Sequence, residues 1–253
     1  MKRLLLSFFV STAVILPSKT MGFQQRAVIC MSRSSKVFSS TQLGSMARQL
    51  STSPRSILSP LLSLKEEVDP GIVEGTELRI VKYPHPALRA KNEEVTLEEL
   101  KDGSIAQLAK EMFLVMYAAE GVGLAAPQVG VNKRLMVYNP TGDRKKWLDE
   151  TVMVNPKIVN YSDAKDIAVE GCLSFPDMDG DVERSKWIKI EALSLNGKKI
   201  KRKFEGWTAR VFQHEYDHLD GVVYPDRLTE EGKAKVQPRL NELIKEFGEG
   251  GSL

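Results

Sequence analysis

Residues 213–221 of this chain have the sequence Gln-His-Glu-Tyr-Asp-His-Leu-Asp-Gly, in which His214, Glu215 and His218 form an H-E-x-x-H pattern. Residues four apart lie on one face of an α-helix, so both imidazoles can reach one metal ion, with the Glu215 carboxylate beside it as a general base. The same spacing also arises by chance on surface helices. Because the chain has only three histidines, we predict that this segment is a helix carrying the metal centre of a hydrolase.

A hydrolytic metal centre needs three protein ligands and one open position for water, so one ligand must come from outside this helix. Cys172, within Glu170-Gly-Cys-Leu-Ser174, is the best candidate because a thiolate binds divalent metals well. Glu170 and Asp217 are alternatives on residue chemistry alone. A lone cysteine is also commonly a small buried apolar residue, and that interpretation stays open.

The remaining pattern predicts an α+β domain, with several short strands around two or three helices. The expected strands are residues 78–81, 134–138, 151–159, 187–195 and 198–204, with the last two joined by a hairpin turn at Asn196-Gly197. Thr96 and Glu99 form a capping-box pattern that starts a short helix, which Gly103 interrupts. Longer helices are expected at 104–119, 208–221 and 229–247, with a kink or break at Pro238.

The charge of the chain is divided unevenly between its two ends. Residues 1–65 contain nine Lys or Arg and no acidic residue, whereas the remainder has 27 basic and 33 acidic residues, a net charge of −6. A basic total would suggest binding to nucleic acid, but the body of the protein is mildly acidic. We therefore expect no direct nucleic-acid binding.

Residues 1–65 have the composition of a cleavable targeting leader. Met1-Lys2-Arg3 and the apolar stretch 4–16 resemble a signal peptide, too short to span a bilayer, and we assign residues 1–22 to it. Residues 23–65 are rich in serine, basic and free of acids, as in a transit peptide. This bipartite pattern indicates a plastid or plastid-like organelle. A mitochondrial presequence is the alternative, and secretion is disfavoured because Cys172 would have no disulfide partner.

Residues 66–253 are expected to form a single catalytic domain with no membrane association. Three blocks in it resemble the signature motifs of peptide deformylases, in the order of that family: Gly121-Val-Gly-Leu-Ala-Ala-Pro-Gln128, Glu170-Gly-Cys-Leu-Ser174 and the segment 213–221. Tyr83-Pro-His-Pro-Ala-Leu-Arg89 is similar to the family's N-terminal turn, with His85 where aspartate is commoner. The resemblance covers about residues 77–247 and is greatest to the bacterial-type and plant organellar 1B branch. It implies antiparallel β-sheets wrapped around a central metal-binding helix, with a C-terminal helix.

The resemblance also implies a chemistry, in which the formyl group is removed from the N-terminal Met of newly made chains. Cys172, His214 and His218 would hold one divalent ion, Fe²⁺ natively, with Zn²⁺, Ni²⁺ or Co²⁺ as substitutes. Glu215 would act as the general base. The Gln128 amide and the Leu173 backbone N–H would stabilise the oxyanion.

A second set of residues is expected to bind the substrate or support the site. Gly123 would contact the substrate chain, and Gln213 would orient a ligand. The expected substrate-binding residues also include Val122, Glu170, Gly171, Trp207 and Val211, and an apolar slot for the Met side chain would be lined by all of these except Glu170. Simple core packing of Trp207 and Val211 is an equally good interpretation. His85 is expected to be exposed and without function.

Two other functions remain open from the sequence. One is a zinc peptidase, since H-E-x-x-H is shared with that class. The other is a non-catalytic module in which the metal only stabilises the fold, or which associates with the organellar ribosome. The helix at 229–247 has mixed charge, so a ribosome contact through it is only a hypothesis.

Overall fold

The computed structural model describes residues 73–248, so the predicted leader at 1–65 lies outside the described residues. Seven strands form two antiparallel sheets, one of five strands in the order β1-β2-β3-β6-β7 and one of two strands, β4-β5. The strands are β1 Gly123–Ala125, β2 Leu135–Tyr138, β3 Thr151–Tyr161, β4 Lys165–Cys172, β5 Phe175–Ser185, β6 Trp187–Leu193 and β7 Lys199–Glu205. The predicted α+β class is confirmed.

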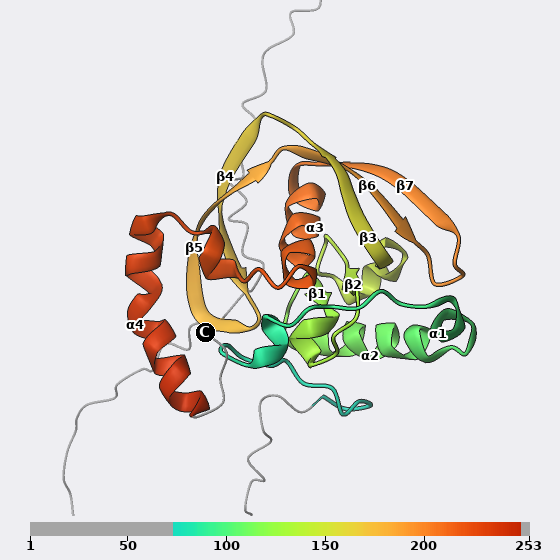
Figure 1. Cartoon of the computed structure of the whole chain (residues 1–253), viewed down its shortest axis with the longest axis horizontal. Coiled ribbons are helices and arrows are strands. Elements are labelled where there is room, and N and C mark those ends of the chain that lie inside the picture. The colour runs from blue at the N-terminus through green and yellow to red at the C-terminus, as the bar shows by residue number, and fades with distance from the viewer. Residues whose placement is uncertain (1–72, 249–253) are drawn as a thin grey trace, which may run out of the picture.

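Four α-helices accompany the sheets: α1 Leu97–Lys101, α2 Ser104–Ala118, α3 Gly206–Leu219 and α4 Glu230–Phe247. Short 3₁₀ helices cover Pro86–Leu88, Ala126–Val129, Arg144–Asp149 and Tyr224–Arg227. In Figure 1, α3 stands in the centre, enclosed by the curved strands, and α4 lies outside β5. None of the helices within residues 73–248 has the length and apolar character needed to cross a membrane.

Local sequence signals account for several boundaries. The Thr96 side chain accepts a hydrogen bond from the Glu99 N–H and the Glu99 carboxylate accepts one from the Thr96 N–H, so the predicted capping box starts α1. Gly103 has a φ of 84°, which separates α1 from α2. The turn at Asn196-Gly197 joins β6 to β7 as predicted, with Gly197 at a φ of 69°.

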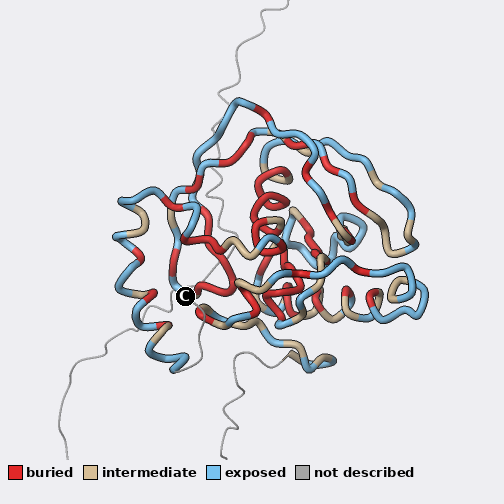
Figure 2. The backbone as a smooth tube through the Cα atoms, viewed as in Figure 1, coloured by how far each residue is buried: buried red, intermediate tan, exposed pale blue. Residues whose placement is uncertain are grey.

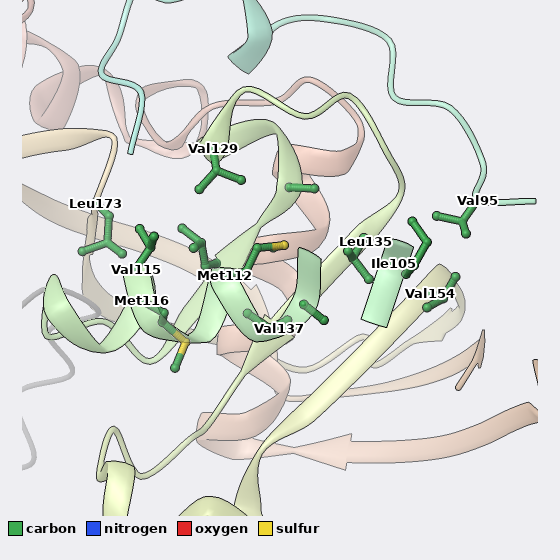
Figure 3. Close-up of a cluster of buried hydrophobic side chains, with 13 residues drawn as sticks. Val95, Ile105, Met112, Val115, Met116, Val129, Leu135, Val137, Val154 and Leu173 are labelled. Atoms are coloured by element: carbon green, nitrogen blue, oxygen red, sulfur yellow. The ribbon is translucent and has the colours of Figure 1, made fainter. Parts of the chain in front are cut away.

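The core lies on both faces of the five-stranded sheet. Figure 3 shows Met112, Val115 and Met116 of α2 packed toward Leu135 and Val137 of β2 on one face. On the other face α3 joins a second cluster, whose other members come mainly from β2, β3 and β6. A third cluster joins the β5 strand to α4 and the turn before α1. These layers hold α3 in the interior of the molecule.

Burying α3 costs desolvation free energy, because many of its buried side chains are polar. Ten of its fourteen residues are buried, and six of these are polar or charged: Arg210, Gln213, His214, Glu215, Asp217 and His218. Figure 2 shows α3 mostly in the colour for buried residues. Buried polar groups must find partners to avoid a large desolvation cost. A helix of this kind is therefore where a functional site is expected.

The structure corrects or narrows the sequence expectations at four places. Residues 78–81 form no strand, although the Val81 N–H donates a hydrogen bond to the Gln128 carbonyl. Strands β4 and β5 were not predicted, because charged residues interrupt their alternation. Helix α4 continues through Pro238, so the division into two segments that was one of the two outcomes expected there does not occur, and the exposed Ala234 leaves the carbonyl that loses its partner open to solvent. His85 is half-buried, and its Nδ1 accepts a hydrogen bond from the Ala87 N–H.

Candidate metal centre

Three buried side chains converge at the C-terminal end of β4 and the C-terminal half of α3. One ligand atom from each of Cys172, His214 and His218 lies within 4.8 Å of the others, and no other such group of three was found within residues 73–248. The Cys172 Sγ lies 3.3 Å from the His218 Nε2. One thiolate and two imidazoles are a ligand set for a divalent transition metal, and three protein ligands leave a fourth position open. The residues present therefore fit a metal ion.

Backbone features bring these ligands together. A register shift between Gly171 and Cys172 interrupts the β4-β5 ladder just before the thiol, as a bulge does when it redirects a side chain. At the far end of α3, the buried Asn92 side chain donates hydrogen bonds to the carbonyls of His218 and Leu219. Asn92 thus fixes the end of the helix that carries a ligand, a role for which the sequence offered no local signal.

Glu170 fixes the orientation of His214. The His214 Nδ1–H donates to the Glu170 carboxylate at 3.0 Å, so the Nε2 of His214 is left for the ion. Arg184 and Arg210 donate to the same carboxylate at 2.7–3.0 Å. Burial opposes the charged form, but the bonds to His214 and Arg184 prevail and lower the pKa of Glu170.

This arrangement corrects the two roles considered for Glu170 from the sequence. Its carboxylate is fully buried and both oxygens are bonded to Arg184, Arg210 and His214. Glu170 is therefore neither the third ligand nor a residue placed to touch substrate. Asp217 is also directed elsewhere, because it binds Arg184 and Arg227.

Gln213 does not orient a ligand, contrary to expectation. Its side chain accepts from the Ser185 N–H at 3.1 Å and donates to the Ser185 carbonyl at 2.9 Å, and it also donates to the Ala209 carbonyl. Gln213 therefore attaches α3 to the end of β5. Its place beside the metal motif reflects this packing role.

The Glu170 contact leads to a testable expectation for metal binding. Replacing Glu170 by Gln should weaken metal binding by about 10- to 100-fold, because the His214 ring loses its anionic partner. Anaerobic titration with a competing chelator measures this constant. The matched control is Glu183→Gln, since Glu183 is an exposed carboxylate on β5. An unchanged metal affinity in folded Glu170→Gln would show that the contact does not support the site.

Glu215 is the one acidic group of the site that lacks a partner. It is 1% exposed, and its Oε2 has no hydrogen-bond partner among the described residues. Burial raises the pKa of Glu215 to about 7. The carboxylate rests against β1, where a Cβ on Gly123 would lie 2.5 Å from its Oε1, so only glycine allows this approach. A group with these properties is suited to accept and return a proton.

Gln128 brings an amide toward the same place. Its Oε1 accepts from the Ala125 N–H at 2.8 Å, which directs the amide nitrogen toward the Cys172 Sγ at 3.5 Å and the Ser174 Oγ at 3.4 Å. Leu173 follows Cys172 directly and is nearly buried. The glycine-rich motif thus contributes a fixed donor beside the predicted ligands.

Three of the residues expected to line a Met slot lie in one cluster. Val211 is fully buried in the cluster between α3 and the sheet, and Val122 and Trp207 pack against it while half-buried. The Trp207 Nε1–H donates to the Pro140 carbonyl, which fixes the ring. Gly171 is buried beside Cys172. The packing role of Val211 and Trp207 is evident, and their contact with substrate stays a prediction.

The fold and the site together define a class of protein. An α+β domain encloses a helix that carries two of three candidate metal ligands, with a carboxylate that lacks a hydrogen-bond partner and a fixed amide beside them. Three such ligands would hold one metal ion and leave a coordination position open. A family model described as polypeptide deformylase matches residues 77–234. The chain belongs to the peptide deformylase family.

Named relatives support this membership. Peptide deformylase 1B, chloroplastic/mitochondrial, of Arabidopsis thaliana is 44% identical over 174 residues, 69% of this chain and 62% of the relative. Peptide deformylase of Pseudothermotoga lettingae is 38% identical over 64% of this chain and 88% of its own length. A solved peptide deformylase from Plasmodium falciparum has a TM-score of 0.65 and 42% identity, covering 69% of this chain and all of that chain. The chain spans 60–64% of the length of the plant relatives that it matches.

Proposed function

We propose that this protein is a metal-dependent hydrolase that removes the N-formyl group from the initiator Met of newly synthesised organellar proteins and releases formate. The observation that carries the proposal is the unpartnered Glu215 carboxylate beside the cluster of Cys172, His214 and His218. A site that only stabilised the fold would be closed by four ligands and would have no use for this carboxylate.

Different residues around the cluster are assigned to different steps of the reaction. A divalent ion held by Cys172, His214 and His218 supplies Lewis-acid activation of water near neutral pH. Glu215 accepts the proton released when the water oxygen bonds to the formyl carbon. It then delivers that proton to the amine nitrogen as the carbon–nitrogen bond breaks, which leaves formate and a free N-terminus.

The formyl oxygen gains negative charge during this reaction, and hydrogen-bond donors are needed to stabilise that charge. The Gln128 amide nitrogen, already held toward Cys172, and the backbone N–H of Leu173 are assigned to this task. Removing one such donor typically raises the barrier by about 2.7–4 kcal/mol. Gly123 would contact the substrate chain through its backbone, while the absence of a side chain leaves room for the Glu215 carboxylate.

We assign the Met side chain of the substrate to a slot lined by Val122, Gly171, Trp207 and Val211. If this is right, Val211→Leu should raise the KM for a formyl-Met peptide by about tenfold relative to a formyl-Ala peptide, since an added methylene fills the slot. The control is Val137→Leu, an equally buried valine in the cluster beneath α2. An equal change in both peptides, or in both variants, would assign Val211 to the core alone.

We assign Fe²⁺ as the native ion, with Zn²⁺, Ni²⁺ or Co²⁺ as ions that the same ligands accept. Elemental analysis of protein purified without oxygen from its native source tests this assignment, and a chain loaded mainly with Zn²⁺ would contradict it. A zinc peptidase is the competing function. Cleavage of an internal bond in an unformylated peptide, without formate release from a formylated one, would favour that class.

Residues 1–65 are proposed to be a cleavable leader addressed to a plastid or plastid-like organelle, with residues 66–253 as the mature catalytic domain. The composition of the leader supports this, as do the chloroplastic names of the plant relatives. A fluorescent protein fused to residues 1–65 should accumulate in plastids, and accumulation in mitochondria would favour the alternative.

A contact with the organellar ribosome through α4 is a further prediction. The charges of α4 are partly paired within the helix, Lys233 with Glu230 and Arg239 with Glu242 and Glu246. Unchanged co-sedimentation with ribosomes after charge reversal on α4 would exclude this helix as the contact.

A further inference from the structure

The β6-β7 hairpin concentrates positive charge in a body that is otherwise acidic. The segment 186–205 contains seven basic and two acidic residues, although residues 66–253 have a net charge of −6. Five of the seven cations lie within six residues of one another: Lys198, Lys199, Lys201, Arg202 and Lys203. All five are exposed. The net charge of residues 66–253 therefore does not represent the local charge of this hairpin.

The register of the hairpin places four lysines on one surface. Ile188, Ile190 and Ala192 of β6 point inward to the cluster under α3, so Trp187, Lys189 and Glu191 point outward. Across the ladder, Lys189 lies opposite Lys203, Glu191 opposite Lys201 and Leu193 opposite Lys199. We call this surface, with Trp187, the basic face. Figure 1 places β6 and β7 at the margin of the molecule, with α3 on their inner side.

Two features of the basic face favour an anionic partner. Lys189 and Lys203 stand directly opposite each other, an arrangement that destabilises a sheet unless something offsets the repulsion. Within the chain, Glu205 pairs with Lys203 but no carboxylate is paired with Lys189 among the ion pairs of the described residues. Both ammonium groups lie over the Trp187 ring, at 5.9 and 4.9 Å from its centroid. Glu191 is the only carboxylate of β6, and Lys201 beside it lowers its pKa, with Lys199 and Lys157 acting in the same direction.

Protection of a sheet edge is the competing explanation, because lysines on edge strands prevent unwanted pairing. Strand β7 is the last strand in the order of the five-stranded sheet. Lys189, however, belongs to β6, which is paired on both sides. Edge protection does not call for a second lysine facing Lys203 across the ladder, nor for an aromatic ring beneath the pair.

We propose that the basic face docks the protein onto the phosphodiester backbone of RNA. Lysines two residues apart on a strand are roughly 6.6 Å apart, and neighbouring strands are about 4.8 Å apart, so the face is a grid of ammonium donors. Trp187 adds a ring on which a base can stack. Apart from Trp187 and the half-buried Leu193, which packs against the cluster beside α2, the outward side chains of β6 and β7 are charged, so the face lacks the exposed aliphatic groups that insertion into a lipid surface requires.

The choice of RNA rests on the proposed function, because a newly made formyl-Met chain emerges from the ribosome, which is rich in RNA. Because α3 lies on the opposite side of β6, RNA on the basic face leaves the metal centre free. The expectation of no nucleic-acid binding was drawn from the net charge of the body. That average conceals the local excess on this hairpin.

The test compares variants of the full chain for binding to a labelled oligouridylate of about 16 nucleotides. Because residues 1–65 are themselves basic, each variant keeps them. The double reversal Lys189→Glu/Lys203→Glu should weaken binding about tenfold or more at low salt. It should also make the negative slope of log affinity against log salt shallower by about 1.4, or 0.7 per lost contact. Lys101→Glu/Lys110→Glu, the same charge change on exposed residues of α1 and α2, should leave affinity and slope near the wild type.

A second variant separates stacking from charge. Trp187→Leu should weaken RNA binding about fivefold with little change in the salt slope, because it removes a ring and no charge. Release of formate from a short peptide should be unchanged in all variants, so a failure of RNA binding is distinct from a failure of the proposed function. Equal effects of the two double reversals would overturn the proposal. The proposal would also be overturned if Lys189→Glu/Lys203→Glu lost binding to phosphatidylglycerol vesicles as strongly as binding to RNA, because the face would then bind anions in general.

Discussion

Replacing Glu215 by Gln is expected to lower kcat/KM for a formyl-Met peptide by on the order of 10³-fold. The amide has nearly the same size but cannot accept the proton from water, and the buried carboxylate that it replaces has no other partner in the described part of the chain. Metal content should not change, because Glu215 is not among the three grouped ligand residues. Formate release and bound metal are measured on the same preparation.

The control for this variant is Glu242→Gln, which changes an exposed carboxylate on α4. It should retain full activity. A Glu215→Gln protein that holds one ion per chain and keeps more than a tenth of the wild-type activity would show that another group moves the proton.

Replacing Cys172 by Ser is expected to weaken metal binding by at least about 100-fold, more than the loss of a supporting contact costs. The hydroxyl is a harder and less acidic ligand than a thiol, so the two histidines would hold the ion without a thiolate. Activity should fall in parallel at limiting metal and recover in part at high metal concentration. Competition with a chelator gives the affinity, and circular dichroism establishes that the variant is folded.

Cys30→Ser is the matched control, because Cys30 is the only other cysteine in the chain. It should bind metal as the wild type does. Retention of full metal affinity by Cys172→Ser would mean that the third ligand is another residue.

Local signals in the sequence predicted the parts of the fold that depend on neighbouring residues. The spacing of His214 and His218 predicted α3, Thr96 and Glu99 predicted the start of α1, and Asn196-Gly197 predicted the β6-β7 turn. Each depends on contacts within about four positions along the chain. The sequence therefore predicted these elements before any tertiary contact was known.

Long-range partners were not predictable in the same way. Arg184 and Arg210 come from β5 and α3 and meet at Glu170, yet neither stands out from other arginines in the sequence. Asn92 lies 126 residues from the His218 carbonyl that it binds. Such contacts are set by the packing of whole elements. The misassigned roles of Glu170 and Gln213 follow from this, since proximity to a motif does not specify which way a side chain faces.

The most direct test of the central claim is a metal titration of the full chain without oxygen, with formate and free Met N-termini measured together on a short formyl-Met peptide. The account predicts that activity rises with Fe²⁺ to a maximum at one ion per chain, that one formate appears for each free N-terminus, and that a chelator abolishes both. Folded protein that binds one ion at Cys172, His214 and His218 but releases no formate would contradict the account.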